Sequence, residues 1–141
     1  MTRWLPGRVT GYEQLEATWL EHGPAPVQDL VADVILGAAP RAEWLASWAA
    51  QDNDQLTLAF RCLMDRDDIT GLLGEITCPA LVVHGTADAA IAMSRAEALR
   101  DGLGGPAGLV RIEGGSHAAN LTHPDQVNAA VLSFLRGLRP D

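Results

Sequence analysis

The chain has 141 residues, 48% hydrophobic and 20% charged, which fits one globular domain and excludes a disordered, collagen-like or disulfide-scaffold protein. Its ten basic residues are all arginine and are outnumbered by 18 acidic residues; the net charge of −8 argues against binding to nucleic acid. The sequence has no apolar run of 18 residues and no signal-peptide pattern, so we expect a cytoplasmic protein that does not enter membranes.

Apolar spacing predicts a series of helices over residues 11–65. The first covers about 12–21 and stops before a Gly-Pro pair. The second starts at Pro26 and ends at Gly37, with one apolar face made of Val27, Leu30, Val31, Val34 and Ile35. A third is expected over about 41–50 and a fourth over about 53–64.

All four tryptophans fall in this helical part, at positions 4, 19, 44 and 48. They either fill the core between short helices or line an apolar ligand pocket, for which Trp44 and Trp48 are the candidates. Cys62 lies in an apolar helical run and is expected to be buried, whereas Cys78 precedes a proline. Neither has a CxxC or histidine partner at ligand spacing, so no metal site and no cofactor are expected.

After residue 70 the pattern changes to strand, helix, strand and helix. Residues 80–84 form a short, β-branched apolar run after Pro79, which predicts a strand buried on both faces in a parallel sheet. The next helix is expected to start with a capping box in which Ser94 caps and Glu97 reaches back. Residues 108–112 predict a second strand, and Pro124 suits the first position of the last helix. The pattern therefore predicts an α/β fold with a β-α-β-α unit and two parallel strands.

The loops that follow the two predicted strands carry a carboxylate and an imidazole. Asp88 lies four residues after His84, which ends the first strand and is interpreted as a buried or hinge residue. His117 lies five residues after the second strand. The carboxyl ends of parallel strands share one edge of the sheet, so we expect Asp88 and His117 to lie together. A carboxylate beside an imidazole is the orienter and base of a hydrolytic triad.

These two segments resemble a known superfamily. Residues 78–88, CPALVVHGTAD, are similar to the P-x-L-v-v-h-G-x-x-D segment that carries the triad acid of α/β-hydrolases, and residues 114–124 resemble their terminal G-x-x-H loop. The closest-looking members are cap-bearing esterases and enol-lactonases with a catalytic serine. The resemblance implies that Asp88 is the acid and His117 the base. It also implies a helical cap over residues 1–70 and the carboxy-terminal β-α-β-α part of the hydrolase core over 71–141.

One part of the family pattern is missing from the sequence, because no serine lies in a G-x-S-x-G elbow. Ser47 and Ser133 lie in predicted helices, Ser94 at a helix start, and Ser116 next to His117 in the histidine loop. The family also takes its oxyanion hole from segments near the elbow and an early strand. We therefore expect a partial α/β-hydrolase fold, the cap plus the carboxy-terminal portion, that is inactive by itself.

Two kinds of function agree with these features. In the first, an amino-terminal half supplies the serine, and the completed site hydrolyses a small apolar or aromatic ester or lactone. Asn120 then either faces the pocket mouth or only hydrogen-bonds within its loop. In the second, the chain is a non-catalytic ligand- or protein-binding module, or a truncated remnant of the same fold. A two-stranded sheet leaves an unpaired edge, so we expect either a homo-oligomer or the complementing half as partner.

Overall fold

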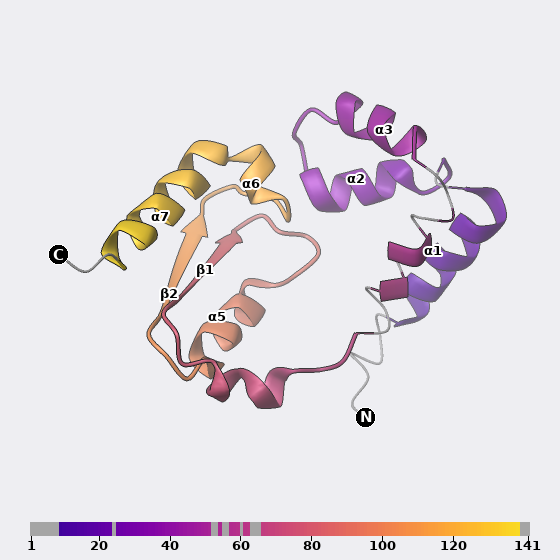
Figure 1. Cartoon of the computed structure of the whole chain (residues 1–141). Coiled ribbons are helices and arrows are strands. Elements are labelled where there is room, and N and C mark those ends of the chain that lie inside the picture. Colours follow the sequence, from indigo (N-terminus) through magenta and orange to yellow (C-terminus); the bar gives the residue numbers. More distant parts are fainter. Residues whose placement is uncertain are drawn as a thin grey trace. The chain divides into compact units, whose positions relative to one another are not determined.

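The structure is a computed structural model that describes residues 9–23, 25–51, 54, 57–59, 61–62 and 66–138 (Figure 1). Its internal contacts divide the chain into two units. The first unit comprises residues 1–32 and 40–68, and the second comprises residues 33–39 and 69–141. Helix α2 (Gln28–Leu36) crosses this division: its last residues, from position 33 on, belong to the second unit, although most of the helical region belongs to the first.

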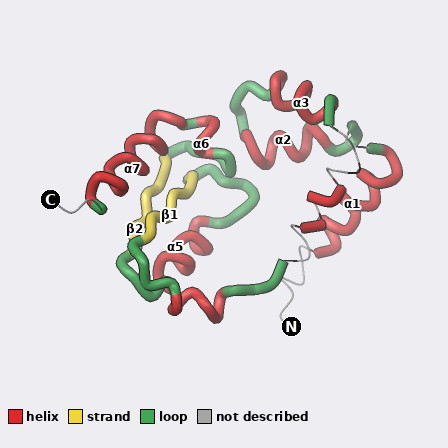
Figure 2. The backbone as a smooth tube through the Cα atoms, in the orientation of Figure 1, coloured by secondary structure: helices red, strands yellow, loops and turns green. Residues whose placement is uncertain are grey.

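The first unit is helical, as the sequence predicts. Helix α1 spans Val9–His22, α2 spans Gln28–Leu36 and α3 spans Ala42–Ala49 (Figure 2). Gly23 and Gly37 follow α1 and α2 with positive φ angles of 74° and 60°, a conformation that glycine adopts readily after a helix. Half of the fourth predicted helix, over 53–64, is described, at positions 54, 57–59, 61 and 62, and all of these are helical; its other positions and Trp4 lie outside the described residues.

The side chains of the helical region correct two predictions. Val27 is buried as expected, but the buried residues of α2 itself are Ala32 and Leu36, which lie outside the predicted face, and Leu30 of that face is 60% exposed. Cys62 was expected to be buried, but it is exposed. Apolar spacing locates a helix correctly here but does not say which of its apolar residues a neighbour covers.

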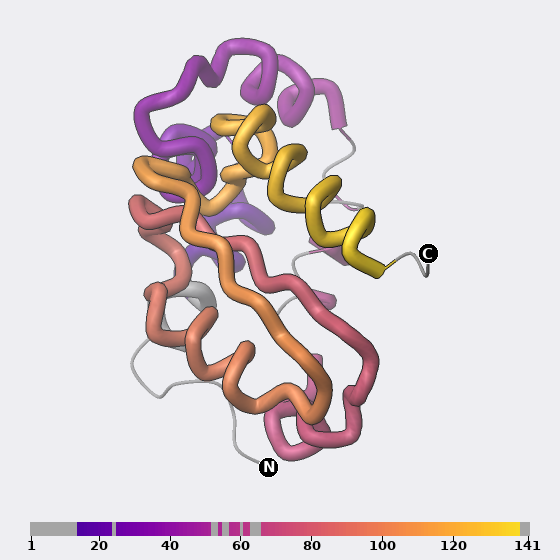
Figure 3. The backbone as a smooth tube through the Cα atoms, turned by 90° about the vertical axis from the view of Figure 1, so that its left-hand side faces the viewer, coloured from indigo at the N-terminus to yellow at the C-terminus, as the bar shows by residue number. Residues whose placement is uncertain are grey.

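The second unit contains the predicted β-α-β-α segment. A 3₁₀ helix, η1 (Thr70–Glu75), precedes β1 (Ala80–Gly85), α5 (Met93–Gly102), β2 (Ala107–Ile112), α6 (Ala119–Thr122) and α7 (Pro124–Gly137). The two strands are parallel, with Ala80 opposite Ala107 and Gly85 opposite Ile112. Helices α5 and α7 both contact the strands and lie on either side of them (Figures 1 and 3). The carboxyl ends of both strands therefore point to the same edge, from which the two loops leave.

Two local predictions in the second unit are wrong. Helix α5 begins at Met93, its N-cap is Ala92, and no side chain caps it, so Ser94 and Glu97 form no capping box. The N–H of Arg95 bonds the carbonyl of Ala92, which starts the helical turn before Ser94 is reached. The first five residues of β1 are only partly buried, so this strand is not covered on both faces within the described residues. No helix in the described ranges has the length and apolar character needed to cross a membrane.

Candidate active site

Backbone hydrogen bonds join the loop after β1 to the loop after β2. The N–H of Thr86 donates to the carbonyl of Ile112, and the N–H of Ala87 donates to the carbonyl of Gly115, both at 2.9 Å. In the opposite direction, the N–H of Gly114 donates to the hydroxyl of Thr86, also at 2.9 Å. The two loops are thus held together before any functional side chain is considered.

Gly85, the last residue of β1, allows this close approach. A Cβ atom added to Gly85 would overlap with the carbonyl group of Gly115 and would lie 2.5 Å from the carbonyl oxygen of Ser116. These are backbone atoms, which cannot rotate away as a flexible side chain could. Glycine is therefore required here because the histidine loop passes directly over the end of the strand.

The carboxylate of Asp88 is held at both of its oxygens. Oδ1 accepts the backbone N–H groups of Ala90 and Ile91 at 2.8 and 2.9 Å. Oδ2 lies 3.0 Å from Nδ1 of His117, across the two joined loops. The Asp88 side chain is only 5% exposed. The carboxylate is therefore fixed with one oxygen toward the imidazole.

The pKa of the Asp88 carboxyl lies below its ordinary value of 3.8. Burial alone would raise it, but the hydrogen bonds from the Ile91 N–H, the His117 ring and the Ala90 N–H, together with the charge of His117, outweigh that effect. Asp88 is consequently ionised near neutral pH and can only accept hydrogen bonds.

This fixes the tautomer of His117. Because an ionised carboxylate cannot donate, Nδ1 of His117 carries the hydrogen of the 3.0 Å bond. In the neutral ring, Nε2 then has the free lone pair and is the nitrogen able to accept a proton. The His117 side chain is 39% exposed, so the ring is accessible while its orienting carboxylate is buried. A buried carboxylate behind an accessible imidazole is the arrangement of a general base with its orienting acid.

Comparison with known proteins agrees with this geometry. A family model described as TAP-like protein, a family of α/β-hydrolases, matches residues 64–141, more than half of the chain. The chain is 34% identical over 111 residues to a Synechocystis protein named as a non-heme chloroperoxidase, a match covering 78% of this chain and 39% of that protein. It is 36% identical over 63 residues to epoxide hydrolase A of Mycobacterium tuberculosis, covering 45% of this chain and 20% of the relative. The chain belongs to the TAP-like family of α/β-hydrolases.

A solved α/β-hydrolase shows how much of the fold is present. The chain superposes on a hydrolase from Pseudomonas aeruginosa with a TM-score of 0.76 and 25% identity, over 95% of this chain and 52% of that one. It therefore spans about half of the solved hydrolase, and less than half of each of the two relatives named above. The Asp88–His117 pair belongs to the half of the α/β-hydrolase fold that is present.

Four other residues were considered from the sequence: Trp44, Trp48, Asn120 and Ser116. Trp44 and Trp48 lie in the first unit and pack edge to face, with ring centroids 5.7 Å apart. Asn120 is exposed in α6, three residues after His117. Ser116 is buried and its hydroxyl lies 3.2 Å from that of Thr122, so it is engaged within its own loop. A pocket role for the two tryptophans and Asn120 remains a prediction.

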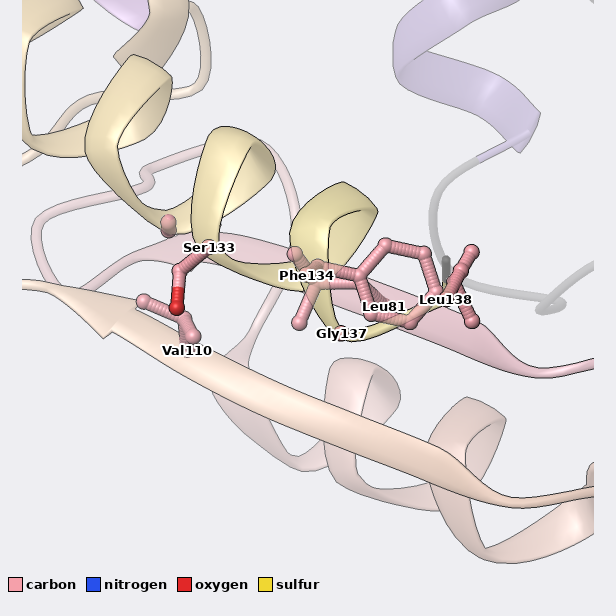
Figure 4. Close-up of a pocket in the computed structure, with 7 residues that line it drawn as sticks. Leu81, Val110, Ser133, Phe134, Gly137 and Leu138 are labelled. Atoms are coloured by element: carbon pink, nitrogen blue, oxygen red, sulfur yellow. The ribbon is translucent and has the colours of Figure 1, made fainter. Parts of the chain in front are cut away.

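An apolar groove of about 440 Å³ lies between α7 and one face of the sheet, and neither Asp88 nor His117 lines it (Figure 4). Leu81 and Val110 of the strands form its floor, and its remaining lining residues are Ala130, Ser133, Phe134 and Gly137 of α7 with the C-cap residue Leu138. The described residues contain no group of three or more histidine, cysteine, aspartate or glutamate side chains placed to hold a metal.

One contact of the site was not anticipated from the sequence. His84, interpreted from the sequence as a buried or hinge residue, directs Nε2 toward Oδ2 of Asp88 at 3.4 Å. The spacing of four residues across the end of β1 was visible in the sequence, but the direction of the ring depends on the turn that follows Gly85.

Proposed function

We propose that this chain is the acid–base half of a serine-hydrolase active site that cleaves small ester or lactone substrates when an amino-terminal half supplies the nucleophile. The observation that supports the proposal is the 3.0 Å hydrogen bond between His117 Nδ1 and the buried carboxylate of Asp88. The half-length match to the solved hydrolase supports the need for a second half.

In the completed site, His117 Nε2 removes the proton of the serine hydroxyl as the serine oxygen bonds to the substrate carbonyl carbon. Asp88 stabilises the resulting imidazolium through Nδ1. The imidazolium then gives its proton to the leaving alkoxide as the carbon–oxygen bond breaks, which leaves an acyl-enzyme. Water repeats the cycle with His117 as base, releases the carboxylic acid and restores the serine. Each step uses Asp88 and His117 in the tautomer that their hydrogen bond fixes.

The surface of the second unit supports a partner that completes the sheet. In the part of the chain that the structure describes, the sheet has two strands, so the far edge of β1 has no strand beside it. Helix α7 has no buried residue, and three of its apolar side chains, Val131, Leu132 and Leu135, are exposed, as is its C-cap residue Leu138. An unpaired strand edge beside an uncovered apolar helix is typical of a surface that another segment covers. The amino-terminal half of the same fold provides both a strand and an apolar face.

The test joins this chain to the amino-terminal part of an α/β-hydrolase that carries a G-x-S-x-G elbow, in place of that protein's own carboxy-terminal part. We expect a fluorophosphonate probe to label the fusion at the elbow serine and the fusion to hydrolyse p-nitrophenyl butyrate. The His117→Ala fusion should fold but lose both signals, because no base activates the serine. The elbow Ser→Ala fusion is the matched control for labelling elsewhere.

Two results would contradict the proposal. Labelling of the present chain by itself would show that it contains its own nucleophile. A fusion that folds, keeps the Asp88–His117 hydrogen bond and remains unlabelled would favour the alternative, a non-catalytic binding module. A third measurement concerns the partner. Self-association of the chain, measured by sedimentation, would favour a second copy of the chain over the amino-terminal half as the partner at the β1 edge.

A further inference from the structure

His84 is a third side chain at the acid, and the triad chemistry does not use it. It lies in β1, its side chain is 11% exposed, and its Nε2 is 3.4 Å from Oδ2 of Asp88. Its other nitrogen, Nδ1, lies 2.9 Å from the carbonyl oxygen of Gly85. Within the described residues, Nε2 is buried and has no aligned hydrogen-bond partner. Buried polar groups normally have a hydrogen-bond partner, so the position of this ring nitrogen beside the Asp88 carboxylate requires an explanation.

The ring stands between two groups that only accept hydrogen bonds. A backbone carbonyl has no hydrogen to donate, and Asp88 is ionised, so neither acceptor can satisfy a lone pair on the ring. A neutral imidazole carries one ring hydrogen and donates to only one of the two acceptors, whereas the imidazolium form donates to both. A hydrogen on Nε2 turns the contact with Oδ2 into an attraction, whereas a lone pair there would repel the carboxylate. The 3.4 Å separation is longer than an ideal hydrogen bond and the two groups are not aligned as one, so the attraction is electrostatic in the arrangement shown.

We propose that His84 is a positioning residue that holds Oδ2 of Asp88 toward His117 through its Nε2–H. Oδ1 is already fixed by the N–H groups of Ala90 and Ile91, so the direction of Oδ2 is set by what faces it. His117 faces it from a loop, whereas His84 faces it from a strand. The catalytic consequence rests on the proposed function, but the positioning itself is a property of this chain and is measured without a nucleophile.

Two substitutions of His84 distinguish its contact with the Gly85 carbonyl from its contact with Asp88. The amide nitrogen of His84→Gln extends to about the position of Nε2 and can still donate to Asp88. The shorter amide of His84→Asn reaches only the position of Nδ1, so it keeps the contact with Gly85 and loses the one with Asp88. The readout is the His117 Nδ1–H proton in 15N-labelled protein: its chemical shift and its protection from solvent exchange. Far-UV circular dichroism and thermal unfolding show whether each variant folds.

We expect the His117 Nδ1–H signal to persist in His84→Gln and to be lost to exchange in His84→Asn, with both variants folded. In the active fusion, His84→Asn should lower kcat about 10²-fold with KM unchanged, the size of effect that a misplaced catalytic group produces. Retention of the signal in both variants, or its loss in both, would overturn the proposal. If neither variant folds, the wild-type chain decides it: 15N shifts that show His84 Nε2 without hydrogen at neutral pH would refute it.

Discussion

Substitution of Gly85 by alanine tests whether the close approach of the two loops holds the site together. The added Cβ overlaps with the carbonyl group of Gly115, so the histidine loop must move away from the end of β1. Overpacking of this kind costs about 1–3 kcal/mol. Loss of the hydrogen bond from Ala87 to Gly115 adds about 0.5–1.5 kcal/mol. We therefore expect Gly85→Ala to lower the free energy of unfolding by about 1.5–4.5 kcal/mol, a large part of the stability of a small domain.

The assay must report on the second unit, and tryptophan fluorescence does not, because all four tryptophans lie at or before position 48. Urea unfolding is instead followed through the amide signals of β1 and β2 in 15N-labelled protein. Gly137→Ala is the matched control: nothing lies within 4 Å of its added Cβ, and alanine near the end of a helix is neutral or slightly stabilising. If Gly85→Ala unfolds within about 0.5 kcal/mol of the wild type and keeps the His117 Nδ1–H signal, the reasoning is wrong.

Three further predictions concern the same unit. In Asp88→Asn the amide can donate to Nδ1 of His117, so we expect the ring hydrogen to move to Nε2, visible in 15N shifts, and the activity of the fusion to fall about 10⁴-fold; an unchanged tautomer would contradict the assignment. Because the pKa of Asp88 is lowered, the stability that its ionised form contributes is complete above its unfolded value of 3.8 and is lost as the pH falls through the lower folded value. A 13C titration of the Asp88 carboxyl should accordingly have its midpoint below 3.8, and a midpoint at or above it would show that burial outweighs the hydrogen bonds. Leu132 is 50% exposed on α7, so Leu132→Asp should change the stability of the isolated chain by less than about 0.5 kcal/mol. The same change should weaken association of the chain with a separately expressed amino-terminal half, measured by sedimentation. If the variant and the wild type associate equally well, α7 is not part of the surface that the amino-terminal half covers.

The sequence predicted those parts of the second unit that depend on local pattern and on the geometry of parallel strands. The apolar run after Pro79 located β1, and the rule that parallel strands end at one edge placed Asp88 near His117. The start of α5 was missed because a capping box is only one way to begin a helix, and the turn at Ala92 forms first. The direction of His84 could not be predicted, because it depends on the turn after Gly85 and on what the ring meets there.

Burial was the least predictable property, because it depends on segments distant in sequence. Leu30 and Cys62 occupy apolar helical positions, yet both are exposed. The partial burial of β1 has the same origin, since a strand of a parallel sheet is covered only when neighbours on both sides are present. The apolar pattern of a segment therefore does not show which of its apolar side chains another segment will bury.

The loop that carries His117 depends on a segment far from it in the sequence. The N–H of Ala118 donates to the carbonyl of Ile35 at 2.9 Å, and Ile35 belongs to residues 33–39, which group with the second unit. The acid–base unit is therefore discontinuous along the chain. A fragment excised at residue 71 would keep Asp88 and His117 but would leave the amide next to the base without its acceptor. Any recombination of this chain with another hydrolase must therefore carry the tip of α2 along with the strands.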